Sequence, residues 1–421
     1  MKRLLMVAFH FPPMGGASGS HRSVGFARHL PEFGWQPVVL TAHPMAYPSL
    51  DMDSPLPPCP IHRAYALDSS RHLAIRGRYF RFTALPDRWS SWRLAAIPLG
   101  MALIQRYRPQ AIWSTYPLAT SHCIAHTLSR WSGLPWVADF RDPMCSPRYP
   151  ADPFMRNYLS RLEEACITRC QKVVTATPEM VQVQQERLPH LPDHHWQVVE
   201  NGWDAWPGAG EIRPTPFTLE RPLELLHSGT LYSGEGERSP LSLLQCFALL
   251  LQQGKIRCLQ QAGGGIPLRL TFRACGQEGW LRQQVDGLGL KDLVVIAPPV
   301  SRQQALEEMA RADGLILLQG EGFNPQVPAK VYEYIQTGRP ILPFVHPHGA
   351  TARLLAAVGI EHLFSLKTDE KLLERIELFL YDIIHNRVWV PSSLAIQPYS
   401  RRQRTACLAN LLHRLIEDPQ Q

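Results

Sequence analysis

Short apolar runs alternate with longer amphipathic stretches along this chain, and the alternation predicts a parallel α/β protein. An apolar run at 3–9 leads through a glycine-containing loop into a helical pattern over 20–33, and the next apolar run lies at 37–41. Buried parallel strands are continuous apolar runs of about this length, and two of them joined by a helix form a βαβ unit. Further strands of the first half are expected at 111–114, 135–139, 172–176 and 196–199, with helices at 94–106 and 121–132.

The same rhythm returns in the second half. Strands are expected there at 223–227, 268–274, 293–297, 314–318 and 340–343, with helices at 239–253, 280–288, 302–311 and 329–337. Between the halves, Asn201-Gly202 and the proline- and glycine-bearing stretch 207–222 interrupt the pattern, as domain linkers do. We therefore predict domains at 1–205 and 206–390, followed by a segment at 391–421 that contains a basic amphipathic helix.

Composition narrows the class of protein. The 421 residues include 43 Lys and Arg against 36 Asp and Glu, which gives a net charge of +7. This modest excess suits a small anionic ligand or an anionic membrane surface, and it is too small to indicate nucleic acid. Nine cysteines without regular spacing favour reduced thiols in a cytoplasmic protein. The apolar run at the start is too short for a signal peptide, and no run is long enough to span a bilayer.

Ligands of open parallel sheets bind at the carboxyl ends of the strands, and glycines follow two expected strands there. Gly15-Gly16 follows the first strand, where backbone amides can approach a phosphate at a helix start. The pattern is not GxGxxG, so we discount a nicotinamide or flavin enzyme. Gly229 follows the first strand of the second half, and Arg238 precedes the next helix. The two could neutralise a diphosphate, or they could be an ordinary turn and a solvated arginine.

The segment 321–342, EGFNPQVPAKVYEYIQTGRPIL, carries the strongest signal. Pro328 suits the first turn of a helix, whose free amide groups can hold phosphate oxygens, and Lys330 adds a positive charge beside them. Glu333 lies nearly one turn further on, where a carboxylate can accept two hydrogen bonds from a ribose diol. Its neighbours are apolar or aromatic, which argues against an ordinary surface acid.

Two other segments each allow two interpretations. The sequence DFRDP at 139–143 fits a structural salt bridge around Arg141, or an acceptor site in which a carboxylate accepts a hydroxyl hydrogen bond. The arginine–aromatic segment 71–93 fits an anionic membrane surface, or aromatic side chains packed under the first domain.

A metal site is not expected. Asp51 and Asp53 resemble an Asp-x-Asp metal motif, but they lie in a proline-rich loop with no strand before it. Cys166 and Cys170 share a helix face without a second pair of cysteines nearby in the sequence. Arginine, lysine and a helix start can neutralise a diphosphate without a metal ion.

Taken together, the motifs resemble glycosyltransferase family 4, whose members are retaining enzymes of GT-B architecture. The resemblance covers nearly the whole chain and rests on the order and spacing of FHFPPMGG, ADFRDP, VENGWD, HSGTLY, RACGQEGW, GLKDLVVIAPPVSR and PAKVYEYIQTGRPIL. It implies two facing Rossmann-like domains with a deep cleft between them. The first domain would be on the acceptor side and the second would bind the donor, and the C-terminal helix would cross back onto the first domain.

The resemblance also implies a set of site residues. Those that match donor-binding positions are Gly15, Gly16, Gly229, Arg238, Pro299, Val300, Lys330 and Glu333. Those expected to act in catalysis are Arg141, Asp142 and Arg238. Pro299 and Val300 would meet the base through main-chain atoms, and no metal or other cofactor would be required.

Three departures from the family pattern affect this assignment. The family's Arg-Lys-Gly signature is reduced to Glu-Arg-Ser around Arg238. The family's paired glutamates lie eight positions apart, whereas Glu321 and Glu333 lie twelve apart. Many relatives also carry a histidine where Arg141 lies. The resemblance therefore leaves the group that activates the acceptor open, and we select Asp142.

The function expected from the resemblance is a metal-independent, hexosyltransferase-like retaining glycosyltransferase. It would move a sugar from a nucleoside-diphosphate sugar to a hydroxyl of a glycan or lipid-linked acceptor in cell-surface polysaccharide biosynthesis. We expect a cytoplasmic protein without a nucleic-acid partner, with a peripheral position at the inner face of the membrane as an option. The alternatives are a non-catalytic nucleotide-sugar sensor or assembly protein, and an epimerase or sugar-phosphate synthase of the same architecture.

Overall fold

The structure is a computed structural model that describes residues 1–421 apart from 17, 147–148, 206–220, 233–237, 256–267 and 418–421. The chain forms two compact units, Met1–Asp204 with Tyr399–Gln421, and Ala205–Pro398. It returns to the first unit at Tyr399 rather than at residue 391, because α13 (Ser393–Ile396) still packs against α10 (Ala329–Gln336). The linker expected at 207–222 lies mostly outside the described residues.

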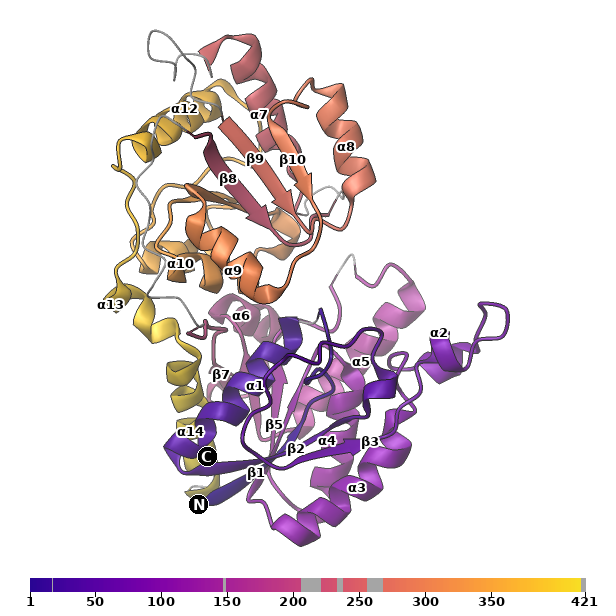
Figure 1. Ribbon diagram of the computed structural model, residues 1–421. Helices are drawn as coiled ribbons and strands as arrows, with labels where there is room; N and C mark the ends of the chain where they lie inside the picture. Colours follow the sequence, from indigo (N-terminus) through magenta and orange to yellow (C-terminus); the bar gives the residue numbers. More distant parts are fainter. Residues whose placement is uncertain (17, 147–148, 206–220, 233–237, 256–267, 418–421) are drawn as a thin grey trace. The chain divides into compact units, whose positions relative to one another are not determined.

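The first unit is built on a parallel sheet whose described strands have the order β3-β2-β1-β4-β5-β6-β7 (Figure 1). Their bounds are β1 (Lys2–Val7), β2 (Trp35–Ala42), β3 (Ile61–Ala64), β4 (Ala111–Thr115), β5 (Trp136–Phe140), β6 (Lys172–Thr175) and β7 (Trp196–Val198). Strand β3 was not expected, because its four residues, Ile-His-Arg-Ala, are too few and too polar to stand out from the loop before them. Since all the pairs are parallel, the carboxyl ends of the strands share one edge of the sheet.

Helices cover both faces of this sheet. They are α1 (Ser18–His29), α2 (Ser69–His72), α3 (Trp92–Tyr107), α4 (Ala119–Ser132), α5 (Pro153–Arg169), α6 (Pro178–Arg187) and α14 (Arg401–Glu417). Helices α5 and α6 were not expected, although each begins with a proline after a capping side chain, Asp152 and Thr177 respectively. A capping residue followed by proline marks a helix start, so the sequence did contain this signal.

Two apolar layers stabilise the first unit. On one face of the sheet, Trp92 and Trp136 are fully buried in a cluster under α3 and α4. On the other face, Trp113 packs edge-on against Phe26 of α1, with ring centroids 5.7 Å apart, and α14 completes the cover. Gly25 lets α14 approach α1, because a Cβ atom there would lie only 2.7 Å from Cδ of Arg401.

The second unit contains a smaller parallel sheet in the order β10-β9-β8-β11-β12 within the described residues (Figure 1). Its strands are β8 (Leu223–Ser228), β9 (Leu268–Arg273), β10 (Val294–Ala297), β11 (Gly314–Gln319) and β12 (Ile341–Val345). Besides α10 and α13, its helices are α7 (Leu241–Gln252), α8 (Glu278–Gly287), α9 (Arg302–Arg311), α11 (Ala350–Ala357) and α12 (Glu370–Ile384).

The predicted class of two parallel α/β domains is confirmed, and so are the five strands expected in the second half. Helices α11 and α12 were not expected; α12 begins after Asp369, whose carboxylate accepts a hydrogen bond from the Leu372 amide. Its apolar face, which includes Ile376 and Leu380, is buried in the core of the unit beside α7. In the described part of the chain, no helix has both the length and the apolar character that a bilayer crossing requires.

Candidate functional site

The carboxyl end of β8 in the second unit brings a glycine turn against a lysine. The strand ends at Ser228, and Gly229 follows with a φ angle of +109°, which strongly favours glycine. A Cβ atom on Gly229 would lie 3.1 Å from Nζ of Lys330, so a side chain here would crowd the ammonium group. The Gly229 amide donates to the carbonyl of Arg273 at 2.9 Å, which fixes the turn to the neighbouring strand.

Helix α10 begins beside this turn. Pro328 precedes its first residue, Ala329, in an extended conformation, and Lys330 lies in the first turn. The first amide groups of any helix have no acceptor within it, and they carry partial positive charge. The hydroxyl of Tyr334 accepts a hydrogen bond from the Ser228 amide at 3.1 Å, so the helix and the strand end are held together. A small positive surface is therefore built into the backbone.

A buried histidine orients the lysine. Nδ1 of His227 lies 3.0 Å from the carbonyl oxygen of Ile316, which can only accept, so this nitrogen carries the proton. The other ring nitrogen, Nε2, is then an acceptor, and Nζ of Lys330 lies 3.2 Å from it. Burial lowers the pKa of His227 well below its ordinary value, and the nearby Lys330 charge lowers it further. The imidazole is therefore neutral at neutral pH and receives a hydrogen bond from the lysine.

The electrostatic environment of Lys330 is unusual. Burial and, after it, the charge of Arg238 lower its pKa to about 7, and Glu333 acts in the opposite direction. Two cations close to one another in a partly desolvated place repel each other, and an anion placed between them would remove that repulsion. A strongly shifted pKa with specific charged neighbours is typical of functional sites.

Contacts with three side chains fix the position of Arg238. Its Nε donates to Oε1 of Gln319, the last residue of β11, at 3.1 Å. Its guanidinium lies over the rings of Phe323 and Tyr232, 4.9 and 5.7 Å from their centroids. Gln319 is itself fixed, since its amide nitrogen donates to the carbonyls of Phe323 and Gln326. Glu237, the first residue of the reduced family signature around Arg238, lies outside the described part of the chain.

Glu333 has a partner that the sequence did not indicate. Its carboxylate lies 3.1 Å from the guanidinium of Arg302, and its side chain is 21% exposed. Arg302 is the first residue of α9, after the capping box of Ser301. The preceding loop contains Pro299 and Val300, and Arg273 fixes its start by donating to the Pro298 carbonyl at 2.8 Å.

The glycine loop of the first unit follows β1. The Gly15 amide donates to the carbonyl of Ser49 at 3.0 Å, and the Ser49 hydroxyl donates back to the Gly15 carbonyl at 3.0 Å. A Cβ atom on Gly15 would lie 3.2 Å from that hydroxyl oxygen, so the loop is packed closely against the segment around Ser49. Gly16 has a φ angle of +71°, a conformation that favours glycine. Both glycines therefore have local structural reasons to be there.

Of the two acids in the DFRDP motif, Asp139 pairs with Arg22 of another element, and only Asp142 lies near Arg141. Asp139 is fully buried, and both of its oxygens accept from Arg22 of α1, at 2.8 and 2.9 Å. The same guanidinium donates to the carbonyls of Val199 and Glu200, so it links α1, β5 and the end of β7. A bidentate arginine satisfies a buried carboxylate better than an adjacent residue of the same strand end can. Asp139 is thus structural.

Arg141 and Asp142 follow this strand end. The Arg141 guanidinium donates to the Gly19 carbonyl at 2.9 Å and lies 4.0 Å from the Asp142 carboxylate, whose side chain is 41% exposed. Arg141 Nε is buried without a described partner, and so is Nδ1 of the adjacent His10. Burial, followed by the Arg141 charge, lowers the pKa of His10 to about 4, so the ring is neutral at neutral pH.

The structure thus gathers some of the expected residues and separates others by role. The cations Lys330 and Arg238 lie together beside the Gly229 turn, whereas Glu333 pairs with Arg302. The sequence reasoning missed the partners that orient these side chains, namely His10, Arg22, His227, Arg302, Gln319 and Tyr334. Four of them, His10, His227, Arg302 and Tyr334, lie in motifs that carry the family resemblance, whereas Arg22 and Gln319 lie outside those motifs.

The acids and cysteines that the sequence analysis discounted as metal ligands have ordinary local contacts. Asp51 accepts from the Asp53 amide at 3.2 Å and from the Ser54 hydroxyl at 2.8 Å, which closes its own loop. Cys170 lies 3.9 Å from a ring nitrogen of His195. The described residues contain no group of three or more His, Cys, Asp or Glu side chains arranged to hold a metal ion.

Known proteins with the same fold exist, although sequence comparison finds none. No protein-family model matches the chain, and no curated protein sequence does so either. A sucrose-phosphate synthase from Thermosynechococcus elongatus is 13% identical, with 100% of this chain and 99% of that chain covered and a TM-score of 0.64. The Anabaena protein HepE in complex with UDP is 15% identical, with 98% and 100% covered and a TM-score of 0.61.

A third solved structure, the apo form of the lipopolysaccharide outer core galactosyltransferase WaaB, is 12% identical. It covers 98% of this chain and 99% of its own, with a TM-score of 0.59. At identities this low the likeness concerns the fold alone. The chain therefore consists of two Rossmann-like domains of the GT-B class.

Proposed function

We propose that the protein is a nucleotide-sugar-dependent glycosyltransferase whose second unit binds the donor. The donor diphosphate would rest against the first turn of α10, with Lys330 and Arg238 as its counter-charges. The observation that carries this proposal is the contact between Gly229 and Lys330, 3.1 Å from a would-be Cβ to Nζ, at a helix N-terminus. Backbone amides, a helix start and two cations at one point form an anion site, and a bare glycine leaves it open to a phosphate.

The nucleoside would extend from this point along α10 toward α9. Glu333 lies nearly one turn beyond Lys330, at a distance that suits the ribose hydroxyls of a nucleotide whose diphosphate is at the helix start. Arg302 now donates to that carboxylate, so the ribose would share or replace this ion pair. The anchored loop with Pro299 and Val300 precedes Arg302, and its main-chain atoms would meet the base.

The transfer itself is proposed to retain the anomeric configuration. The bond between the anomeric carbon and the β-phosphate oxygen would break, and the acceptor oxygen would bond to the same face of that carbon. The acceptor's proton would pass to the departing phosphate oxygen. Lys330 and Arg238 would stabilise the charge on that phosphate, so that the reaction proceeds without a metal ion.

The acceptor side is the less specific part of the proposal. Asp142 and Arg141 are the expected acceptor groups of the first unit, and the exposure of the Asp142 carboxylate leaves it accessible to a hydroxyl. We propose a hexose donor and a glycan or lipid-linked acceptor of cell-surface polysaccharide. The described cysteines all carry free thiols, which supports a cytoplasmic location.

Calorimetric titration with nucleotide-sugars tests the donor site. HepE was crystallised with UDP, so UDP-glucose and UDP are the first ligands to try, followed by their GDP and ADP counterparts. Lys330→Met should weaken binding by about a hundredfold, because it removes a charge-assisted contact to phosphate in a partly desolvated place. Lys291→Met, which removes an exposed lysine paired with Asp286, is the matched control and should change nothing.

Turnover then separates the proposal from its alternatives. Release of UDP together with formation of a glycosylated acceptor of the same anomeric configuration supports a retaining transferase. Tight binding without turnover on any acceptor would indicate a nucleotide-sugar sensor, and conversion of the sugar without an acceptor would indicate an epimerase. If no nucleotide-sugar binds more tightly to the wild-type protein than to Lys330→Met, the proposed donor site is wrong.

A further inference from the structure

The first unit carries an exposed hairpin that its core does not use. After α2, the chain reverses at Arg76 and Gly77, which have φ angles of +51° and +77°, and Ile75 and Arg78 are paired across the turn. Figure 1 shows this hairpin projecting outward beyond α2. We call residues 73–82 the hairpin tip.

The hairpin tip is apolar and solvent-exposed. Ile75, Phe80 and Phe82 are 77%, 70% and 71% exposed. The rings of Phe80 and Phe82 stack on each other, with centroids 5.6 Å apart, rather than turning inward. Large apolar side chains scattered over a surface need no explanation, but a cluster at the end of a projection is typical of an interaction site.

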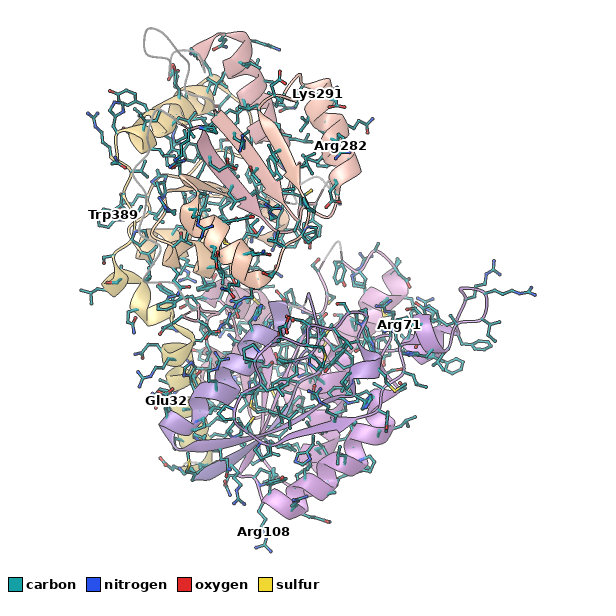
Figure 2. The ribbon with its side chains drawn as sticks, in the orientation of Figure 1. Glu32, Arg71, Arg108, Arg282, Lys291 and Trp389 are labelled. Atoms are coloured by element: carbon teal, nitrogen blue, oxygen red, sulfur yellow. The ribbon has the colours of Figure 1, made fainter. Side chains whose placement is uncertain are left out.

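Positive charge surrounds these apolar side chains. Residues 71–93 include six arginines and one acid, Asp87, which is partly buried and accepts from the Thr120 amide at 2.8 Å. The guanidinium groups of Arg76 and Arg78, within the tip, form no hydrogen bond or ion pair with any described residue. Figure 2 shows the side chains beyond Arg71 extending away from the unit. The tip therefore combines apolar groups with cations whose charge is not neutralised locally.

The base of the hairpin is firmly held. The Ser69 hydroxyl donates to the Thr83 and Arg88 carbonyls at 2.7 and 3.0 Å, which closes the segment at both ends. Arg71 donates to the Tyr47 carbonyl at 2.6 Å, and Arg81 pairs with Asp152. The base of the projection is consequently tied to the unit, which lowers the cost of ordering the segment when it meets a partner.

The two interpretations of segment 71–93 thus apply to different parts of it. Trp89 and Trp92 are buried in the core of the first unit, as the packing interpretation requires. The side chains of Ile75, Phe80 and Phe82 are not buried. The membrane interpretation concerns the hairpin tip alone.

We propose that the hairpin tip docks the protein onto an anionic lipid bilayer. Phe80, Phe82 and Ile75 would enter the interface between headgroups and acyl chains, and Arg76 and Arg78 would bind lipid phosphates. Charge complementarity selects the partner, because two unpaired arginines, Arg76 and Arg78, beside exposed apolar groups match a surface that is anionic outside and apolar beneath. Nucleic acid fits less well, because Ile75 has no face on which a base can stack and the tip is a projection rather than a groove.

Vesicle flotation with the full-length protein tests this proposal, and it does not depend on the donor. The wild-type protein should float with vesicles of phosphatidylcholine and phosphatidylglycerol and stay behind with phosphatidylcholine alone. The double variant Arg76→Gln with Arg78→Gln should lower the partition coefficient by about fivefold for each arginine at low salt. High salt should shrink that difference, because it screens the charges.

The apolar contribution needs a separate variant. Phe80→Ser with Phe82→Ser should reduce partitioning at both low and high salt, since burial of the rings is not screened. Arg282→Gln and Leu394→Ser, which change an exposed arginine and an exposed leucine of the second unit, are the matched controls. All these side chains are exposed, so every variant should unfold at the same temperature as the wild-type protein, which thermal unfolding checks.

Three results would overturn the proposal. The first is wild-type protein that does not float with anionic vesicles at low salt. The second is equal flotation of the hairpin and control variants. The third is binding of single-stranded RNA that the hairpin variants abolish while vesicle flotation persists, which would assign the tip to nucleic acid.

Discussion

Lys330 should take up a proton when the donor binds. Burial and the Arg238 charge hold its pKa at about 7 in the free protein, so the side chain is only half protonated at neutral pH. The negative charges of a diphosphate would favour the ammonium form and raise that pKa again. A group with a pKa of about 7 is about nine-tenths deprotonated at pH 8, so complete protonation takes up about 0.9 proton there and about 0.1 at pH 6.

Isothermal titration calorimetry measures this uptake directly. The heat of binding at pH 8 is compared in two buffers of different ionisation enthalpy, and the dependence gives the number of protons. A nucleotide-sugar is the right ligand, because it lacks the terminal phosphate that titrates near pH 6 in a free nucleotide. Lys330→Met should abolish the uptake together with most of the affinity, whereas Lys291→Met should leave the number of protons unchanged.

The sign of the pH dependence provides a second check. Because binding takes up protons, donor affinity should fall about fivefold from pH 7 to pH 8 and nearly tenfold from pH 8 to pH 9. The pKa of Lys330 in the folded protein lies below that of the unfolded chain, 10.5, so the unfolded state binds more protons between about pH 7 and 10.5. This residue therefore makes the ligand-free protein more stable as pH rises through that window. Equal heats in both buffers at pH 8, or an affinity that does not change from pH 7 to 9, would refute the reasoning.

Three further predictions concern single residues. Gly229→Ala should weaken donor binding at least tenfold, and should destabilise the unit by about 1–3 kcal/mol because alanine strains at this φ angle; calorimetry and thermal melts measure both. Arg22→Ala should destabilise the first unit by about 3–5 kcal/mol, because it leaves the buried Asp139 carboxylate unpaired, and a denaturant midpoint equal to wild type would contradict this. Arg302→Ala should tighten donor binding a few-fold, because it frees Glu333 for the ribose. The effect should be small, since the arginine is 43% exposed. Weaker binding would show that Arg302 itself holds the donor.

The periodic elements of the fold could be predicted from the sequence, because burial dictates their pattern. Continuous apolar runs gave β1, β2, β11 and β12, since strands buried on both faces have no polar alternation. Strand β3 was not predicted, because it has only four residues and pairs with one neighbour among the described strands. Helices α5 and α6 were not predicted because their apolar residues gather less clearly on one face than those of α8 and α9, so that only their capping residues mark them.

The candidate site was predictable in its backbone and unpredictable in its partners. Gly229 and Lys330 follow from strand ends and a helix start, which are local features. The neighbours of these residues depend on which strands lie side by side. Gln319 reaches Arg238 only because β11 pairs with β8, and Arg302 reaches Glu333 only because α9 begins beside α10. A long-range contact of this kind, 81 positions apart in the first case, has no signature in a single sequence.

The return of the chain at Tyr399 determines the order in which the protein can be completed during synthesis. The second unit is one continuous stretch inserted in the first, and α14 emerges from the ribosome after all of it. Until then, the face of the first sheet that contains Trp113 is covered by α1 but not by α14. A chain truncated before residue 399 should therefore contain a folded second unit and an incomplete first unit, which exposes apolar surface and is sensitive to proteases. Glu417 pairs with Lys2, so these two parts of the chain lie close together. A circular permutant that joins them and begins between the units would make each unit contiguous in the gene.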